Sequence, residues 1–311
     1  MKILAGFTGF VGGNIAAACK FDMLCNSKNI SEAFKTNPDL LVYSGVPAEM
    51  FLANNNPAAD KAVTDNAADN IRKINPKRLV LISTIAALDN PVDADEDVQI
   101  NPERLTVYGL NRLDLEKKAN NIVKKCHVIR LPGLFGSGIK KNFIYDMINF
   151  LPAMLNKAKY DELSAKEPLI AENYIGLNNG FYKLVPDLVR DNEKKAKLKE
   201  AFLRCSFSAL NFTDSRSVFQ YYNLLYLWGH IKTVIEYDIP LLHTAAEPVS
   251  AGKLYEHIYG KPFINELPKP PFNYNFKTKY ADAFGGKDGY IFTANQVMKE
   301  ISEFMEDNKI D

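Results

Sequence analysis

The sequence predicts an α/β protein built on a doubly wound parallel sheet. Short apolar segments, typical of strands buried on both faces, alternate with helical segments in the first half of the chain. The first apolar segment runs directly into a glycine-rich turn, and that turn opens a helix. Such alternation favours a parallel sheet with helices on both faces. The 311 residues are enough for one large α/β domain or two smaller ones.

The expected elements of the first half follow one another in regular order. The strands are expected at residues 1–5, 21–25, 39–45, 78–84 and 127–131. A helix is expected over 57–74, because Asn-Pro at its beginning is typical of a helix start. A second long helix is expected over 102–123, after a polar, acidic loop at 88–101.

The pattern changes after Gly136. Residues 137–205 are expected to be mostly helical. Beyond them we expect a helix at 217–230, a short strand at 239–243, an extended or looped segment at 262–276 and an amphipathic helix at 293–308. The aromatic run that begins at Phe219 is interpreted as a core face of that helix, with a base-stacking surface as the alternative.

The glycine-rich turn is the strongest functional signal. Gly6, Gly9 and Gly12 allow a tight turn, close approach of a diphosphate to the backbone, and close packing of helix on strand. The turn also aims free backbone N–H groups and the positive end of a helix dipole at one point. A dinucleotide site is therefore predicted here, and a plain strand-to-helix connection is the alternative.

Ligands of doubly wound sheets bind at the carboxyl ends of the strands. The residues that we expect at this edge of the sheet, and assign to a dinucleotide, are Gly6, Thr8, Gly9, Phe10, Val11, Gly12, Asn26, Ser27, Lys28, Ser44, Gly45, Val46, Ser83, Leu131, Pro132 and Gly133.

A tyrosine and an arginine form a second candidate group. Tyr108 and Arg112 lie four residues apart on the expected helix 102–123 and therefore share a face. A cation beside a phenol lowers the pKa of the phenol, and such a phenol can exchange a proton while a hydride moves. The hydroxyl of Thr84, helped by Ser83, is expected to bind the same oxygen of the substrate. The alternative is an ordinary Tyr–Arg pair on a helix surface.

Several of these motifs together resemble the extended short-chain dehydrogenase/reductase family, many of whose members are nucleotide-sugar epimerases, dehydratases and reductases. The motifs are G-x-x-G-x-x-G with Thr8 before its second glycine, Ser83-Thr84 followed by Tyr108-x-x-x-Arg112 and Glu116, the segment 128–136, and the segment 247–255. The resemblance covers most of residues 1–260. It implies a Rossmann-type NAD(P)-binding domain from 1–136 and about 206–250, and a smaller, mostly helical substrate-binding lobe from about 137–205 and 251–311.

The resemblance also implies roles for individual residues. Tyr108 is expected to act as acid/base and to contact the cofactor together with Arg112, and Asn66 is expected to order the cofactor or a helix. Lys140, Lys141 and Asn142 lie where the substrate lobe of the family begins, and they are candidates to bind a substrate diphosphate. Members of the family often dimerise through the two helices that correspond to 57–75 and 102–123, so a homodimer is expected.

Two departures from the family pattern bear on the reaction. The family lysine is Arg112 here; an arginine keeps its charge but cannot act as a neutral amine. Ile85-Ala86 stands where the dehydratases have an acid pair, which favours hydride transfer to or from a sugar carbon, as in an epimerase or a reductase. The rival hypotheses are a non-catalytic NAD(P)-binding sensor or scaffold and an enzyme for a small ketone or aldehyde.

The expected cofactor is NADP. The end of the second strand, Asn26-Ser27-Lys28, lacks the acid that usually binds the ribose hydroxyls of NAD. Lys28 and Ser27 suit a 2′-phosphate, although Asn26 also suits plain ribose, so NAD remains the alternative.

Composition argues against several other classes of function. The formal net charge is +1, so no broad field attracts nucleic acid or an anionic membrane, and no apolar run is long enough to span a bilayer. The four cysteines and four histidines are scattered, which predicts reduced thiols in the cytoplasm and no metal site.

Overall fold

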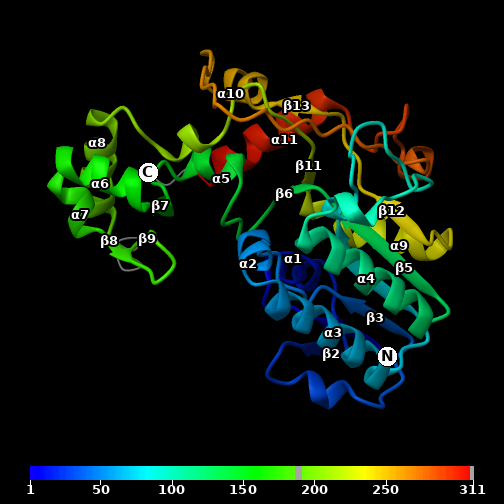
Figure 1. The fold of residues 1–311 in the computed structure, drawn as a ribbon. Helices are drawn as coiled ribbons and strands as arrows, with labels where there is room; N and C mark the ends of the chain where they lie inside the picture. The colour runs from blue at the N-terminus through cyan, green and yellow to red at the C-terminus, as the bar shows by residue number, and fades with distance from the viewer. Residues whose placement is uncertain (186–190, 309–311) are drawn as a thin grey trace. The chain divides into compact units, whose positions relative to one another are not determined.

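A computed structural model describes residues 1–185 and 191–308. The chain forms two compact units (Figure 1). The first unit consists of Met1–Ile139, Val218–Ser250 and Phe272–Ile301. The second consists of Lys140–Ser217, Ala251–Pro271 and Ser302–Asp311.

The first unit is built on a six-stranded sheet with the order β12-β5-β4-β3-β1-β2. Its strands are β1 (Lys2–Ala5), β2 (Met23–Cys25), β3 (Leu40–Tyr43), β4 (Leu79–Thr84), β5 (Cys126–Leu131) and β12 (Leu241–His243), and every neighbouring pair is parallel. The chain leaves β1 for β2 on one side and returns to β3 on the other side. The order of the strands therefore reverses between β1 and β3, which is the place where open α/β sheets bind ligands.

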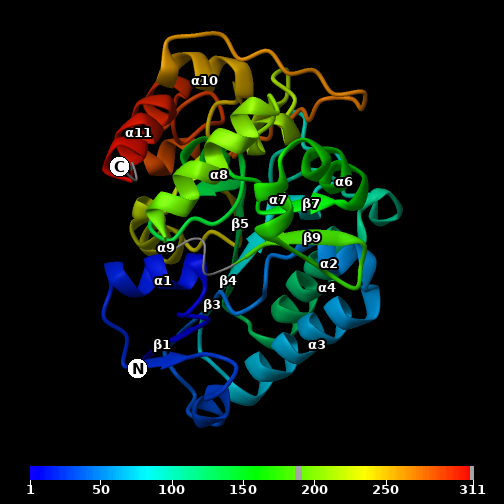
Figure 2. The same cartoon turned by 90° about the vertical axis from the view of Figure 1, so that its left-hand side faces the viewer.

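Helices cover both faces of this sheet (Figures 1 and 2). The helices α3 (Pro57–Ile74) and α4 (Val107–Ile122) pack on one face, and α1 (Phe10–Ala18) and α9 (Leu227–Glu236) pack on the other. The predicted doubly wound α/β fold is confirmed.

The sequence of α3 explains both its ends and its buried face. Asn56 caps the helix by accepting a hydrogen bond from the Ala59 N–H, with Pro57 at the first helical position. Asn75 ends the helix in the left-handed conformation, at φ 54°. The buried residues recur every three or four positions, as a stripe that faces the sheet requires; they are Thr64, Ala67, Ala68, Asn70, Ile71 and Ile74.

The predicted helix over 217–230 is wrong. The structure has β10 (Val218–Phe219), which pairs with β13 (Val249–Ser250), and β11 (Tyr221–Asn223), which pairs with β6 (Gly133–Phe135). Aromatic and β-branched residues are frequent in strands, and here pairing with distant strands decides the conformation. Helix α9 begins only at Leu227.

Two further helices complete the first unit. They are α2 (Met50–Asn55) and the part of α11 (Ala294–Asp307) up to Ile301. The bounds of α11 agree closely with the amphipathic helix expected at 293–308.

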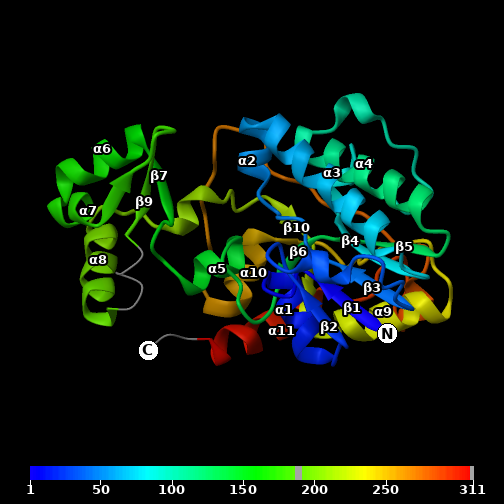
Figure 3. The same ribbon diagram turned by 90° about the horizontal axis from the view of Figure 1, so that it is seen from below.

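The second unit combines helices with a small antiparallel sheet of order β7-β9-β8 (Figure 3). Its elements are α5 (Phe143–Ile148), β7 (Met154–Asn156), α6 (Lys157–Lys166), α7 (Pro168–Glu172), β8 (Tyr174–Gly176), β9 (Phe181–Leu184), α8 (Asn192–Arg204) and α10 (Ala251–Tyr259). The helices α6, α7 and α8 bury Leu163, Ile170 and Phe202 in a core of their own. The sequence did not indicate the three strands, because strands of three or four residues show almost no periodicity.

The units differ from the predicted lobes in two segments. Residues 206–217 group with the second unit, and residues 272–301 group with the first. The roles of the units in cofactor and substrate binding stay predictions. Within residues 1–185 and 191–308, no helix has the length and apolarity needed to cross a membrane.

Candidate functional site

The glycine turn follows β1 and contacts the segment that follows β3. Gly6 has a φ of +91°, and a Cβ added to it would lie 2.6 Å from the backbone of Gly45. A Cβ on Gly12 would lie 2.1 Å from the carbonyl oxygen of Gly6. Only glycine fits at Gly6 and Gly12, because any side chain there would collide with backbone atoms. The turn therefore lies directly at the reversal point between β1 and β3.

The amino end of α1 leaves backbone donors available. Gly9 is the N-cap residue and provides no side-chain cap, while the Gly13 N–H donates to the Gly9 carbonyl at 2.7 Å. The N–H groups of Phe10, Val11 and Gly12 come before the first intrahelical hydrogen bond and thus have no acceptor within the helix. This helix end without a side-chain cap, beside a turn with glycine at positions 6 and 9, fits a diphosphate.

The turn after β2 lies next to the glycine turn. The Gly6 N–H donates to the Cys25 carbonyl at 2.7 Å, and the Asn26 side chain accepts a hydrogen bond from the Lys28 N–H at 2.8 Å. Asn26 therefore shapes this turn. The side chains of Ser27 and Lys28 are exposed.

The segment after β3 lies on the other side of the glycine turn. The Ser44 hydroxyl and the Ser44 N–H both donate to the Ala5 carbonyl, each at 2.9 Å, and Val46 packs against the core.

Asn66 is exposed on α3. The buried asparagine of this helix is Asn70, whose amide donates to the Tyr43 hydroxyl at 3.5 Å.

Tyr108 lies in the first turn of α4, close to the end of β4. Thr106 caps this helix by accepting a hydrogen bond from the Gly109 N–H at 3.2 Å. A Cβ on Gly109 would lie 2.1 Å from the Ala86 carbonyl oxygen, so only glycine lets α4 approach the turn that follows Thr84. The side chains of Tyr108 and Thr84 share a hydrogen bond. The structure thus brings together the two residues predicted to bind the reacting oxygen.

Arg112 connects Tyr108 to two other segments. Its guanidinium lies over the Tyr108 ring, with Cζ 4.3 Å from the ring centre. It donates two hydrogen bonds of 3.0 Å to the carboxylate of Asp60 on α3, and one of 2.8 Å to the Pro47 carbonyl. Asp60 also accepts a hydrogen bond of 2.8 Å from the Asn111 amide. Both charged side chains are largely buried, with 5% exposure for Arg112 and 12% for Asp60.

The expected lowering of the Tyr108 pKa is wrong. Burial of the phenol raises its pKa above the ordinary value. The charge of Arg112 and the hydrogen bonds from Arg112 and Thr84 lower the pKa, whereas the charge of Asp60 raises it. Burial dominates, so Tyr108 is a neutral phenol at physiological pH.

Ser83 belongs to a buried ionic network. Its hydroxyl donates to Glu116 Oε1 at 2.5 Å, and Arg130 donates to both oxygens of Glu116, at 3.0 and 2.6 Å. Nη1 of Arg130 lies 3.3 Å from Nε2 of His243, whose Nδ1 lies 3.1 Å from the Lys277 carbonyl. His243 therefore carries its proton on Nδ1. Ser83 is thus bonded to Glu116, and its role beside Thr84 stays a prediction.

This network was not predicted as part of the site. An arginine within the apolar strand β5 is a sequence signal for a buried ionic partner, because an unpaired charge is not tolerated there. Its partners Glu116 and His243 come from distant segments and carry no comparable local signal.

Some of the remaining predicted residues lie in the first unit and others in the second. In the first unit, the Gly133 N–H donates to the Gln220 carbonyl at 3.2 Å, directly after Leu131 and Pro132. In the second unit, Asn142 has a φ of +108° and caps α5 by accepting a hydrogen bond from the Tyr145 N–H at 3.1 Å. The neighbouring side chains of Lys140 and Lys141 are exposed.

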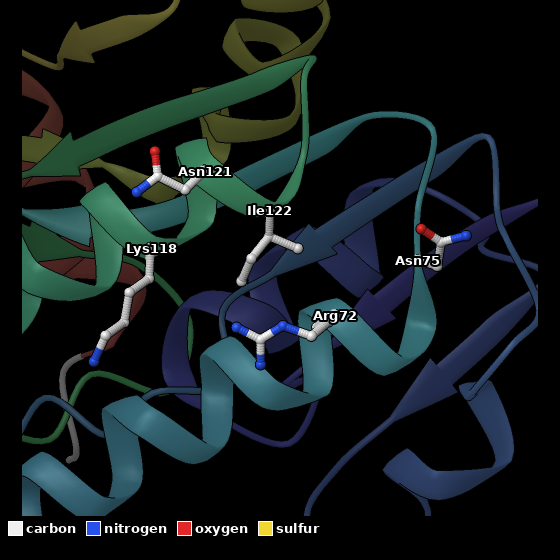
Figure 4. A pocket seen from close by; sticks show the side chains of 5 residues that line it. All are labelled: Arg72, Asn75, Lys118, Asn121 and Ile122. Carbon is white, nitrogen blue, oxygen red and sulfur yellow. The ribbon is translucent and has the colours of Figure 1, made fainter.

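A hollow of about 400 Å³ lies at the carboxyl ends of α3 and α4 (Figure 4). It is lined by Arg72, Asn75, Lys118, Asn121 and Ile122. Since these helices run antiparallel to the strands, the hollow lies at the opposite edge of the sheet from the glycine turn. It is not part of the predicted site.

In the described part of the chain, no group of three or more His, Cys, Asp or Glu side chains is placed to hold a metal ion.

No protein-family model and no curated protein sequence matches this chain. Solved structures do match it over nearly its whole length. The dTDP-4-dehydrorhamnose reductase of Yersinia enterocolitica is 13% identical, with a TM-score of 0.63 and 99% of each chain covered. The reductase of the same description from Bacillus anthracis, solved in complex with NADP, is 13% identical, with a TM-score of 0.62 over 98% of this chain and 97% of the other.

A UDP-N-acetylglucosamine 4-epimerase from Methanobrevibacter ruminantium is 11% identical, with a TM-score of 0.62 over 98% of this chain and 96% of the other. At these identities the likeness concerns the fold. The chain thus has, over nearly its whole length, the fold of these nucleotide-sugar reductases and of this epimerase.

Proposed function

We propose that the protein is an NAD(P)-dependent oxidoreductase or epimerase that transfers a hydride to or from a sugar carbon of a nucleotide sugar. The observation that carries this proposal is the pairing of Tyr108 with Thr84 at the carboxyl end of β4. The pair belongs to the same unit as the glycine turn and to the same edge of its sheet. One edge thus combines a turn suited to an anion with the phenol of Tyr108 and the hydroxyl of Thr84, which can donate or accept a proton.

The residues at this edge fit a nicotinamide dinucleotide. The diphosphate would be held by the free N–H groups at the start of α1, beside Gly6 and Gly12, where no side chain blocks its approach. The exposed Ser27 and Lys28 suit the 2′-phosphate of NADP, so NADP is the proposed cofactor, with NAD as the alternative. Leu131, Pro132 and Gly133 are proposed to border the pyridine end.

The chemistry that this cofactor supplies when bound is the transfer of a hydride. Thr84 is proposed to hold the reacting oxygen through its hydroxyl. Tyr108 is proposed to donate the proton to that oxygen or to accept it. Arg112 lies over the ring and fixes its position, and its own position is fixed by Asp60 and Pro47.

The substrate class and the assembly are further parts of the proposal. Nucleotide sugars are proposed because solved structures of the same fold are described as enzymes of such sugars. Lys140, Lys141 and Asn142 of the second unit are candidates to bind the substrate diphosphate. We propose a homodimer through α3 and α4, and a cytoplasmic location stays a prediction.

The hydrogen bonds of Arg112 also favour a second candidate, a non-catalytic NAD(P)-binding sensor or scaffold. Asp60 and Pro47 hold the guanidinium, so it is not free to bind ribose hydroxyls as the family lysine does. Replacing Arg112→Lys tests whether the site is that of a decayed enzyme. A large gain in turnover indicates a decayed enzyme, whereas no gain fits either an enzyme adapted to arginine or a protein without turnover.

Tyr108→Phe tests the proposed enzyme. Loss of the phenol hydroxyl should lower turnover of NADPH with a panel of nucleotide sugars by about 10²- to 10⁴-fold, the usual contribution of a general acid. NADPH affinity should stay within a few fold of the wild type. The control is Tyr237→Phe, because Tyr237 is 63% exposed and has no part in the site. Unchanged turnover in Tyr108→Phe would remove Tyr108 from its proposed role.

A further inference from the structure

The cation next to Tyr108 is paired with a buried acid. Asp60 accepts two parallel hydrogen bonds from Arg112, and this geometry gives the strongest pairing between a carboxylate and a guanidinium. Because both groups are largely shielded from water, their charges cancel at short range with little screening. Tyr108 therefore lies beside a neutral pair rather than beside a free positive charge.

Charged and polar groups from three elements act on the Tyr108 phenol. Arg112 comes from its own helix, Asp60 from α3 and the neutral hydroxyl of Thr84 from β4. Burial of the phenol and the charge of Asp60 both raise its pKa, and only Arg112 and the hydrogen bonds lower it. Asp60 is the single acid in this set, and its charge opposes the effect of the arginine on the phenol.

We propose that Asp60 is a positioning residue that offsets the charge of Arg112 and, together with burial, keeps Tyr108 protonated, so that the site is set to reduce a carbonyl rather than to begin by oxidising an alcohol. The effect of Asp60 on Tyr108 is a property of the chain alone. The direction of the reaction rests on the function proposed above.

A protonated phenol is the form that reduction requires. The carbonyl carbon accepts a hydride from a dihydropyridine ring, which is thereby oxidised to the pyridinium, and the C=O π bond opens. The carbonyl oxygen accepts the proton of Tyr108, leaving a phenolate that regains a proton from water. Oxidation of an alcohol needs the phenolate from the start, so its rate at neutral pH falls as Tyr108 becomes harder to ionise.

Asp60→Asn separates the charge of Asp60 from its shape. The amide keeps one acceptor for Arg112, but the arginine is then uncompensated. The pKa of Tyr108 should fall by about one pH unit or more, as expected for an unpaired cation beside an acid. The measurement is the ultraviolet absorbance of phenolate as a function of pH. The transition of Tyr108 is identified because it is missing when Tyr108→Phe is added to the same background.

Asp69→Asn is the matched control. Asp69 also lies on α3 and pairs with an arginine, Arg72, but this pair is exposed and lies nine residues further along the helix than Asp60. The control should leave the Tyr108 transition in place. Adding Arg112→Gln to Asp60→Asn should return the transition to high pH, because both charges are then gone.

A Tyr108 transition that stays unchanged in Asp60→Asn overturns the proposal. If Asp60→Asn does not fold, titration of the wild type can still overturn the proposal. Its Tyr108 phenol, assigned with Tyr108→Phe, should titrate above the ordinary pH of 10, and titration below that value overturns the proposal.

The direction is tested with NADP⁺ and two alcohols, dTDP-glucose and UDP-N-acetylglucosamine. At pH 7, Asp60→Asn should oxidise at least one of them about tenfold faster than the wild type, since the phenolate fraction rises in proportion. Oxidation by the wild type that is already independent of pH near 7 overturns the inferred direction. If Tyr108 titrates as expected but neither alcohol is oxidised, the proposed enzymatic function is contradicted, whereas the effect of Asp60 on Tyr108 is still supported.

Discussion

Two regions at the same edge of the sheet are built in different ways. The glycine turn, at the ends of β1 and β3, is a backbone structure in which Gly6 and Gly12 leave no room for a side chain. The tyrosine cluster lies at the end of β4 and consists of Tyr108, Thr84, Arg112 and Asp60. Its charged side chains, Asp60 and Arg112, come from segments far apart in the chain. The comparison indicates that the first region is set by shape alone. The second is set by charge, so pH and single charge changes can alter it.

The largest effect is expected in the ionic network behind the tyrosine cluster. Glu116→Gln leaves the buried Arg130 without its counter-charge and should lower the free energy of unfolding by about 3 to 5 kcal/mol. Denaturant unfolding measures this loss. Glu162→Gln, which breaks only exposed pairs with Lys159 and Lys166, should leave the unfolding curve almost unchanged. Equal curves for the two variants would show that the buried network adds no stability.

The pH dependence of stability sharpens the contrast. Burial and the nearby Arg130 lower the pKa of His243 to about 4, below the ordinary value of 6.5. A histidine with a lowered pKa in the folded state contributes stability above pH 6.5, and this contribution is lost as the pH falls from 6.5 to 4. The loss should reach roughly 3 kcal/mol. Unfolding of the wild type and of His243→Gln at several pH values measures it, and the glutamine variant should show a flatter profile. Identical profiles would remove His243 from the account.

The glycine turn should respond to volume rather than to charge. Gly12→Ala places a methyl group 2.1 Å from the Gly6 carbonyl and should weaken NADPH binding by about tenfold to 100-fold, because overpacking costs about 1 to 3 kcal/mol. The neighbouring Gly13→Ala is the control, since its Cβ would meet the Phe7 carbonyl oxygen only at 3.6 Å. Calorimetric titration with NADPH compares the two. Equal affinities would contradict a diphosphate site at this turn.

The same difference explains what the sequence could predict. Local patterns were sufficient for the parallel sheet, for α3 at Pro57–Ile74 and for the glycine turn, because caps, glycines and periodicity are local properties. They failed over 217–230, where pairing of β11 with β6 overrides any helical preference.

The partner of Arg112 was also beyond local reasoning. Asp60 lies in the first turn of α3, where an acid is ordinary for a helix start, and nothing nearby indicates a partner on α4. Reasoning that leaves out the charge of Asp60 and the burial of the phenol expects a lowered pKa for Tyr108, whereas the structure gives a raised one. A charge cluster of this kind depends on tertiary contacts and could not be read from spacing alone.

The most direct test of the central claim is calorimetric titration of the whole chain with NADPH and with NADH. We expect saturable binding to a single site per chain, with NADPH bound more tightly than NADH. If neither nucleotide binds at millimolar concentration, the glycine turn does not hold a dinucleotide, and the proposed oxidoreductase is contradicted.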